Sequence, residues 1–156
     1  MQNIQSIELW VKFTTTTQFA FMSRRQSSEH FGLYHNTSPG AGVQLNVAWS
    51  SGGNSSAVIT NNIINSGNLT HVVATWVWGA TFNRKVYLNG VLQSGYPLTE
   101  INTGNAASQS SGSDDLRIAS ETSSSRRMDG VVGHAAVYSN TMSALDVAAH
   151  YAAGIL

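Results

Sequence analysis

Residues 69–94 read LTHVVATWVWGATFNRKVYLNGVLQS and carry the strongest structural signals of the chain. Every second residue of the segment 69–77 is apolar, which predicts a β-strand with one face toward a core and a mixed, half-buried second face. The inward set is Val72, Ala74 and Trp76. Asn89 and Gly90 then separate two short β-forming runs, and this pair tolerates the positive φ that both positions of a type I′ turn need. The segment therefore predicts a strand followed by a β-hairpin.

The same alternation recurs on both sides of this segment. In residues 7–13, Ile7, Leu9, Val11 and Phe13 face one way, while Glu8, Trp10 and Lys12 face the other. Further short strands are expected at 19–23, 31–35, 43–49, 57–60, 116–119 and 128–138. Polar loops are expected at 24–30, 50–56, 103–113 and 120–127. Gly130 and Gly133 predict a bend or bulge in the last strand.

Only the end of the chain has a helical pattern. Ser143 and Asp146 have capping-box spacing, Ala-rich sequence follows to Ala153, and Gly154 is a typical C-terminal stop. Many short strands with one terminal helix predict an all-β, antiparallel sandwich or jelly roll. With 156 residues and no visible linker, the chain is expected to form a single domain over residues 1–156.

Composition excludes several classes of function. The net charge is zero and only 10% of residues are charged, so the chain lacks the basic excess that drives binding to nucleic acid or to anionic membranes. It has no cysteine, which excludes disulfides, thiolate metal sites and a cysteine nucleophile. The N-terminus shows no signal-peptide pattern, and no apolar stretch approaches the roughly 20 residues of a membrane span. We expect no membrane insertion.

Four segments, in order, resemble the laminin-G-like family of the concanavalin A-like lectin and glucanase superfamily. Residues 6–12, SIELWVK, resemble its "FTIEAWVK" strand, and residues 71–76, HVVATW, resemble its "HVAVTW". Residues 86–92, VYLNGVL, resemble its "LYVNGVL" hairpin, and residues 128–154 resemble its closing strand and helix. The resemblance implies a concanavalin A-like jelly-roll fold. It does not specify a function, because this sandwich hosts lectins, hydrolases, adhesion modules and virion proteins.

Two departures from the family pattern affect the expected site. The family usually opens with a strand containing "FDG" twenty-odd residues before the Trp-bearing strand, whereas only nine residues precede Trp10 here. By this resemblance the domain is expected to lack the family's first strand, which would leave a sheet edge uncovered. We expect another chain, or another copy of this one, to cover that edge. Gly133 and His134 stand where the family commonly has Asp-Glu, which weakens an inferred calcium site.

No motif for catalysis is present. The superfamily that the chain resembles includes glucanases, which share a strand with the pattern Glu-x-Asp-x-Glu. This sequence has no such spacing. It also has no Gly-x-Ser-x-Gly elbow and no His-x-His or His-x-x-x-His pair. Asp114 and Asp115 are adjacent acids that either ligate Ca²⁺ with loop carbonyls or, as we favour, form a solvated turn. The sequence predicts no catalytic residue, no metal site and no required cofactor.

Binding residues are predicted from aromatic and arginine side chains. A sugar offers an apolar face and a polar rim, so Trp78 at a strand end and Tyr96 after the hairpin are candidate sugar platforms, although packing roles are the alternative. Arg24 and Arg25 form a paired charge suited to acidic sugars or carboxylates, with a solvated loop as the alternative. We expect sheet packing for Trp10, Trp49 and Trp76, and also for His71 and His150.

Two functions fit these observations. The first is a non-catalytic structural and recognition module on a virion or cell surface, such as a phage capsid-decoration or tail-associated protein. The alternative is a carbohydrate-binding lectin module of a secreted bacterial enzyme or adhesin. Either function predicts a virion-surface or extracellular location, with a protein, a second copy or a glycan as the partner.

Overall fold

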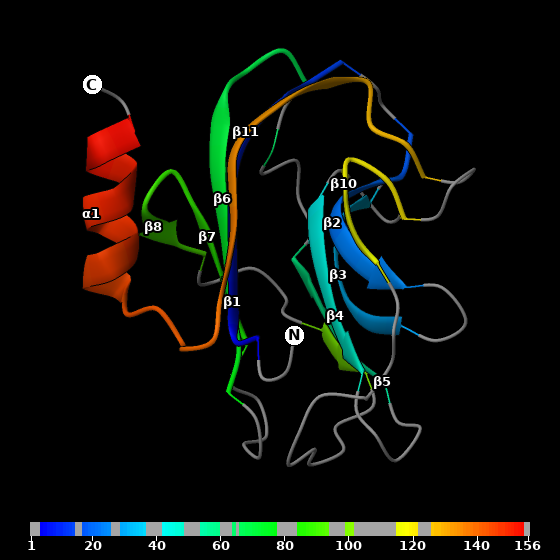
Figure 1. The fold of residues 1–156 in the computed structure, drawn as a ribbon, viewed down its shortest axis with the longest axis horizontal. Helices are drawn as coiled ribbons and strands as arrows, with labels where there is room; N and C mark the ends of the chain where they lie inside the picture. Colours follow the sequence, from blue (N-terminus) through cyan, green and yellow to red (C-terminus); the bar gives the residue numbers. More distant parts are fainter. Residues whose placement is uncertain are drawn as a thin grey trace.

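Two antiparallel β-sheets pack face to face, and one helix covers the outer face of the first sheet (Figure 1). The computed structural model describes residues 4–14, 17–25, 29–36, 42–48, 54–59, 64, 66–77, 84–93, 99–101, 115–121 and 126–154. The first sheet has the strand order β11 (Gly130–Tyr138), β1 (Ser6–Phe13), β6 (Thr70–Thr75), β7 (Lys85–Leu88), β8 (Val91–Leu92). The second has the order β10 (Leu116–Ile118), β2 (Phe19–Arg25), β3 (Glu29–Asn36), β4 (Gly42–Ala48), β5 (Asn54–Ile59), β9 (Thr99–Ile101). The helix is α1 (Ala144–Gly154), so the predicted antiparallel jelly-roll sandwich with one C-terminal helix is confirmed.

The core lies between the sheets and is built by the predicted inward faces. Ile7, Leu9, Val11 and Phe13 of β1 are buried, as are Val72, Ala74 and Trp76 from β6 and the residue that follows it. They pack with apolar side chains of the second sheet, among them Phe19, Phe21, Phe31, Leu33 and Leu45. The period-2 pattern correctly predicted these faces, because alternate residues of a strand point to opposite sides.

Several boundaries differ from the prediction. The expected loop 24–30 is shorter, since β2 continues to Arg25 and β3 begins at Glu29, with Arg24 opposite Phe31. The expected loop 50–56 also gives way to β5 from Asn54, and the short strand β9 was not predicted. In each case backbone hydrogen bonding to a neighbouring strand holds the polar residues in an extended conformation. This pairing overrides their weak intrinsic preference for strands.

The predicted local motifs are confirmed. Asn89 and Gly90 have φ values of 50° and 79° and join the paired strands β7 and β8. Ser143 and Asp146 form the capping box: the Asp146 N–H donates to Ser143 Oγ at 3.2 Å, and the Ser143 N–H donates to Asp146 Oδ2 at 2.9 Å. The predicted irregularity in β11 is a bulge at residues 134–135, which lie opposite Leu9 alone, and His134 has a φ of 48°.

Helix α1 changes the environment of the outer sheet face. All six residues of β6 are buried, so the second face of this strand is fully covered and not half-buried as predicted. Val147 of α1 packs with Val73, Tyr87 and Met142 in a second apolar cluster. Tyr151 stacks on Trp10 with ring centroids 5.6 Å apart. Among the described residues, no helix has the length and apolar character needed to cross a membrane.

Candidate functional site

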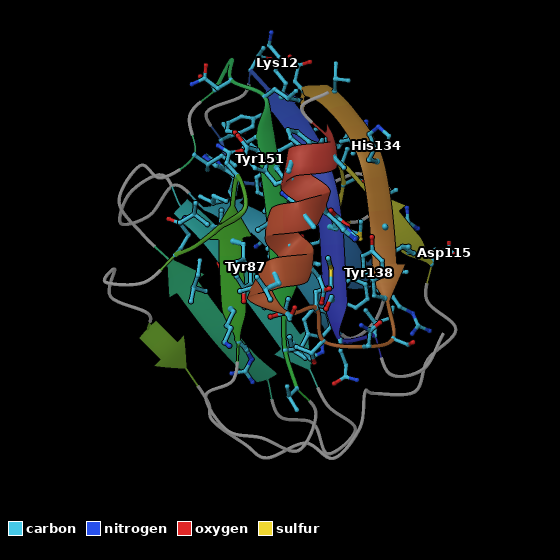
Figure 2. The ribbon with its side chains drawn as sticks, turned by 90° about the vertical axis from the view of Figure 1, so that its left-hand side faces the viewer. Lys12, Tyr87, Asp115, His134, Tyr138 and Tyr151 are labelled. Atoms are coloured by element: carbon cyan, nitrogen blue, oxygen red, sulfur yellow. The ribbon has the colours of Figure 1, made fainter. Side chains whose placement is uncertain are left out.

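A groove runs along the outer face of the first sheet, between α1 and the edge strand β11. The helix covers β1 and β6 but leaves the outward side chains of β11 open beside it, where Figure 2 shows His134 and Tyr138. The groove has a volume of about 630 Å³. Its lining comprises Glu8, Trp10, His134, Ala135, Ala136, Tyr138, His150, Ala153 and Gly154. This volume falls within the range of small-molecule sites, and the small side chains allow a ligand to approach the backbone closely.

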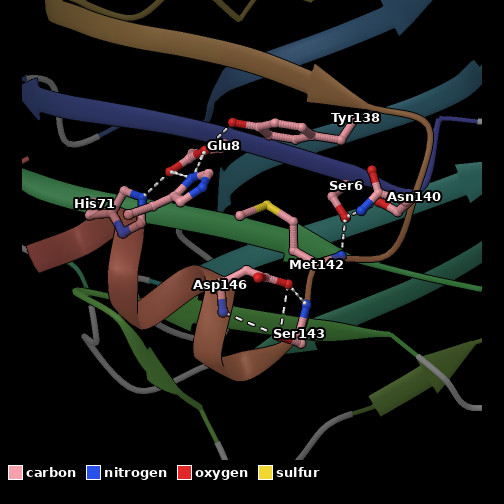
Figure 3. A network of polar contacts seen from close by, with 9 residues as sticks. Ser6, Glu8, His71, Tyr138, Asn140, Met142, Ser143 and Asp146 are labelled. Atoms are coloured by element: carbon pink, nitrogen blue, oxygen red, sulfur yellow. Dashed lines mark hydrogen bonds and ion pairs between the residues drawn. The ribbon is translucent and has the colours of Figure 1, made fainter. Parts of the chain in front are cut away.

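The Glu8 carboxylate lies at the base of the groove and joins three elements (Figure 3). His71 of β6 donates from Nε2 to Glu8 Oε1 at 2.7 Å, and Tyr138 of β11 donates from its hydroxyl to Oε2 at 2.5 Å. His150 of α1 lies with Nδ1 3.2 Å from Oε1 and 3.0 Å from Oε2. Four short contacts therefore occupy both oxygens of a side chain that is 8% exposed.

These contacts determine the charge of the site. Burial alone would raise the pKa of Glu8, but the hydrogen bonds from His71, Tyr138 and His150 outweigh it and lower that pKa to about 2. Burial and the adjacent Glu8 carboxylate raise the pKa of Tyr138 to about 12. Near neutral pH the site therefore holds an ionised carboxylate and a neutral phenol. Neither group has a pKa close to that of an effective general acid or base.

The two histidines of this cluster differ in access. His71 is fully buried, and its Nδ1 has no hydrogen-bond partner in the described part of the chain. The side chain of His150 is 43% exposed, and its hydrogen bonds to Glu8 use Nδ1. His150 Nε2 is therefore the polar atom of this cluster that is best placed to meet a ligand in the groove.

Of the four residues predicted as binding residues, Arg24 is the one whose side chain the structure describes, and it is not part of the groove lining. Trp78 and Tyr96 lie outside the described residues. Arg24 and Arg25 belong to β2 rather than to a loop; Arg24 is only 7% exposed, and the Arg25 side chain lies outside the described part. Backbone pairing of β2 with β3 holds both arginines in a strand. The prediction that this charged pair lies on a loop is therefore wrong.

The other predicted residues have these positions. Trp76 and Trp10 are packed, as expected, whereas Trp49 and Asp114 lie outside the described residues. Asp115 is 77% exposed at its side chain and pairs with Arg117 at 3.7 Å, as the solvated alternative predicted. Within the described ranges, no group of three or more His, Cys, Asp or Glu side chains could hold a metal ion.

Sequence reasoning missed the Glu8 cluster as a unit. Glu8 was expected only on the outward face of its strand, and sheet packing was expected for both histidines. The available signal was an acid flanked by the apolar residues Ile7 and Leu9 in β1. The register places Trp10 opposite His71 and Glu8 opposite Val73, so Glu8 and His71 are diagonal neighbours. Tyr138 is a diagonal neighbour of Glu8 on the other side, because Ala136 lies opposite Glu8, and His150 joins them through the packing of α1.

Comparisons with known proteins agree on the fold. Residues 2–148 match the family described as the Concanavalin A-like lectin/glucanases superfamily. No curated protein sequence matches the chain. A heptameric SAP-like pentraxin from Limulus polyphemus is similar in structure, with a TM-score of 0.65, 17% identity, and coverage of 94% of this chain and 69% of the pentraxin.

Two bacterial toxin domains are also similar. The receptor-binding domain of botulinum neurotoxin type G has a TM-score of 0.66 at 10% identity, over 97% of this chain and 38% of that chain. The binding domain of serotype D has a TM-score of 0.66 at 13% identity, over 100% of this chain and 37% of that chain. The chain thus spans well under half of either toxin domain, and at these identities the likeness concerns the fold.

Proposed function

Because the chain belongs to the laminin-G-like family of the concanavalin A-like lectin/glucanase superfamily, we propose that it is a non-catalytic recognition module. The observation that carries this proposal is the state of Glu8. It is the one carboxylate among the groove-lining residues, and both of its oxygens are used in holding β1, β6, β11 and α1 together. An open groove whose acid is committed to structure suits binding better than bond cleavage.

Hydrolysis of a glycosidic bond sets a specific requirement that the groove does not meet. Such enzymes need two carboxyl groups about 5 to 9.5 Å apart, one acting as acid and one as nucleophile or base. The groove lining supplies Glu8 alone, and a carboxyl with a pKa of about 2 does not serve as a proton donor at neutral pH. The test is incubation of the chain with dye-labelled glucans. Hydrolysis that disappears in Glu8→Gln would overturn the non-catalytic proposal.

The role we propose for the module is assembly and recognition on the surface of a virion or a cell. Support comes from the low charge of the chain, 10% of residues, and from a Ser, Thr and Asn content that suits an uncharged exterior. Among the described residues β11 pairs only with β1, and its other edge offers a place for a protein partner. In this proposal the module is located on a virion or outside the cell.

Glycan binding is the second candidate, and the composition of the groove favours it. Small apolar walls from Ala135, Ala136 and Ala153 lie beside the imidazole of His150, a combination that fits a sugar with an apolar face and a hydroxyl rim. The sequence candidates Trp78, Tyr96, Arg24 and Arg25 define a separate proposed location for the same ligand class.

A glycan-array screen with and without Ca²⁺, followed by calorimetry on any hit, decides between these candidates. Loss of the hit in Ala135→Trp, which fills the groove without changing the Glu8 contacts, assigns binding to the groove. Loss in Trp78→Ala assigns it to the predicted aromatic site. Leu145→Ser is the control, because Leu145 is 83% exposed on α1 and outside the groove lining. A blank array rejects the lectin candidate and leaves a protein partner as the proposed ligand.

A further inference from the structure

One side of the sandwich, bounded by the edge strands β10 and β11, leaves its core partly open. Four apolar residues pack against the main core while remaining only partly buried: Leu116, Met128, Val132 and Val137. All four come from β10, from β11 or from the segment just before β11. Figures 1 and 2 together place β10 and β11 on the same side of the molecule. In Figure 2 the label of Asp115 marks the β10 end.

The two strands also present free edges on this side. Within the described residues, β11 pairs only with β1, and β10 pairs only with β2. Val131 of β11 is 67% exposed and Ile118 of β10 is 45% exposed. Free backbone groups beside exposed apolar side chains form a template for pairing with another chain.

The β11 edge lacks the usual protection against such pairing. Its nine residues, GVVGHAAVY, include no Asp, Glu, Lys, Arg or Pro, which are the residues that normally discourage edge-to-edge contact. By contrast, β8 at the other end of the same sheet has two residues, and α1 lies against it. A strand this short offers little edge for pairing, so the first sheet has one long, uncharged edge.

The bulge at residues 134–135 limits how β11 can pair. It interrupts the ladder at His134 and separates residues 130–133 from residues 136–138. The first of these segments lies close to β10, because the Met128 N–H donates to the Ala119 carbonyl at 2.9 Å. Residues 130–133 thus combine an unbroken free edge with the exposed Val131 and the nearby Ile118.

We propose that this side is where a second copy of the chain docks, through antiparallel pairing of residues 130–133 about a two-fold axis. The pairing places Val131 of each copy opposite Val131 of the other and covers the nearby half-buried Val132 and Met128 of both cores. This inference rests on the proposed assembly role and names its partner.

Charge favours a second copy as the occupant. The open side is flanked by acids and bases in equal number: Asp115 just before β10, Arg117 on β10, and Arg127 and Asp129 before β11. A two-fold contact needs a surface that complements itself, and a rim with both signs meets this condition. The whole chain has no net charge, so no long-range repulsion opposes the approach of two copies.

The size of this side predicts a weak dimer. The four paired residues extend about 13 Å, and two sheets about 10 Å apart with their side chains make a side roughly 20 Å deep. The contact centred on them then buries roughly 260 Å² per copy, or about 500 Å² in total, which is below the size of most specific interfaces. We therefore expect dissociation in the upper micromolar range.

The test is sedimentation equilibrium or light scattering of the full chain from about 1 to 200 µM, a range that brackets micromolar dissociation. The expected result is a rise from the mass of one 16.7 kDa chain toward that of two. Val131→Lys should abolish the rise, because it places a charge at the paired edge.

Val91→Lys is the matched control: it changes the same residue type at 64% exposure, but on β8 at the opposite side. Circular dichroism and thermal melting of both variants show that each is folded, and Ile118→Lys provides a second disruption within the same contact. A chain that stays monomeric at all concentrations overturns the dimer, as does equal disruption by Val91→Lys. Either result leaves the recognition proposal standing, since glucan hydrolysis and the glycan array test it independently.

Discussion

Replacing Glu8 with glutamine tests the central feature of the groove. The pKa of Glu8 falls from its ordinary value of 4.5 to about 2 in the folded protein. At about 1.4 kcal/mol per pKa unit, this difference corresponds to about 3 kcal/mol of stability. That is a substantial share of the roughly 5 to 15 kcal/mol that stabilises a typical domain.

The sign of the pH effect follows from which state binds the proton more tightly. The unfolded carboxyl binds a proton at higher pH than the folded one, so the stabilisation by Glu8 is complete above its unfolded pKa. It is lost as the pH falls from about 4.5 through about 2. Glutamine cannot ionise and leaves one of the donors His71, Tyr138 or His150 facing an amide N–H.

The assay is urea unfolding followed by tryptophan fluorescence, from neutral pH down to about pH 2.5, where Glu8 begins to bind its proton. Above pH 5.5 or so, Glu8→Gln should be less stable than the natural chain by about 3 kcal/mol, and the gap should narrow as the pH falls. Asp129→Asn provides the control, because it removes an exposed carboxylate that lies outside the Glu8 cluster. A gap for Glu8→Gln that stays constant down to the lowest pH would refute this account of the site.

Three further predictions concern the helix and its contacts. Ser143→Ala removes the capping hydroxyl and should lower the free energy of unfolding by about 1 kcal/mol, measurable by urea denaturation. Gly154→Val introduces a Cβ that would lie 2.4 Å from the indole of Trp10. This substitution should lower the free energy of unfolding by about 1 to 3 kcal/mol and shift the tryptophan emission. Unchanged emission would argue against this packing. Gly90→Ala and Gly67→Ala both place a Cβ at positive φ, which costs about 1 kcal/mol. Only Gly90→Ala would also press on Tyr151, at 3.1 Å, so it should melt at a lower temperature than Gly67→Ala, and equal melting temperatures would contradict the contact.

Much of the fold could be predicted because its signals are local. Alternation identified the inward faces of β1 and β6, the Asn89-Gly90 pair identified the hairpin, and the Ser143 and Asp146 spacing identified the start of α1. Strand ends were less predictable. Arg25 and Asn54 lie in strands only because neighbouring strands pair with them, and pairing is not encoded at the residue itself.

The candidate site was less predictable than the fold. Trp78 and Tyr96 were chosen for their side chains and stay predictions, whereas the described groove is built around Glu8, for which no role was predicted. Its members come from β1, β6, β11 and α1, and 142 positions separate Glu8 from His150. Proximity between such distant positions depends on where the helix docks.

The sequence by itself determined that this chain is an antiparallel sandwich of one family, and which face of its main strands points inward. The tertiary structure decided what covers the other face. Once α1 lies over β1 and β6, Glu8 changes from an outward acid into a buried, ionised group held by three hydrogen-bonding partners, and β11 remains beside it with an open groove and a free edge. The physical reason is that side-chain alternation follows from local backbone geometry, whereas burial and pKa depend on the elements that long-range packing brings against each face.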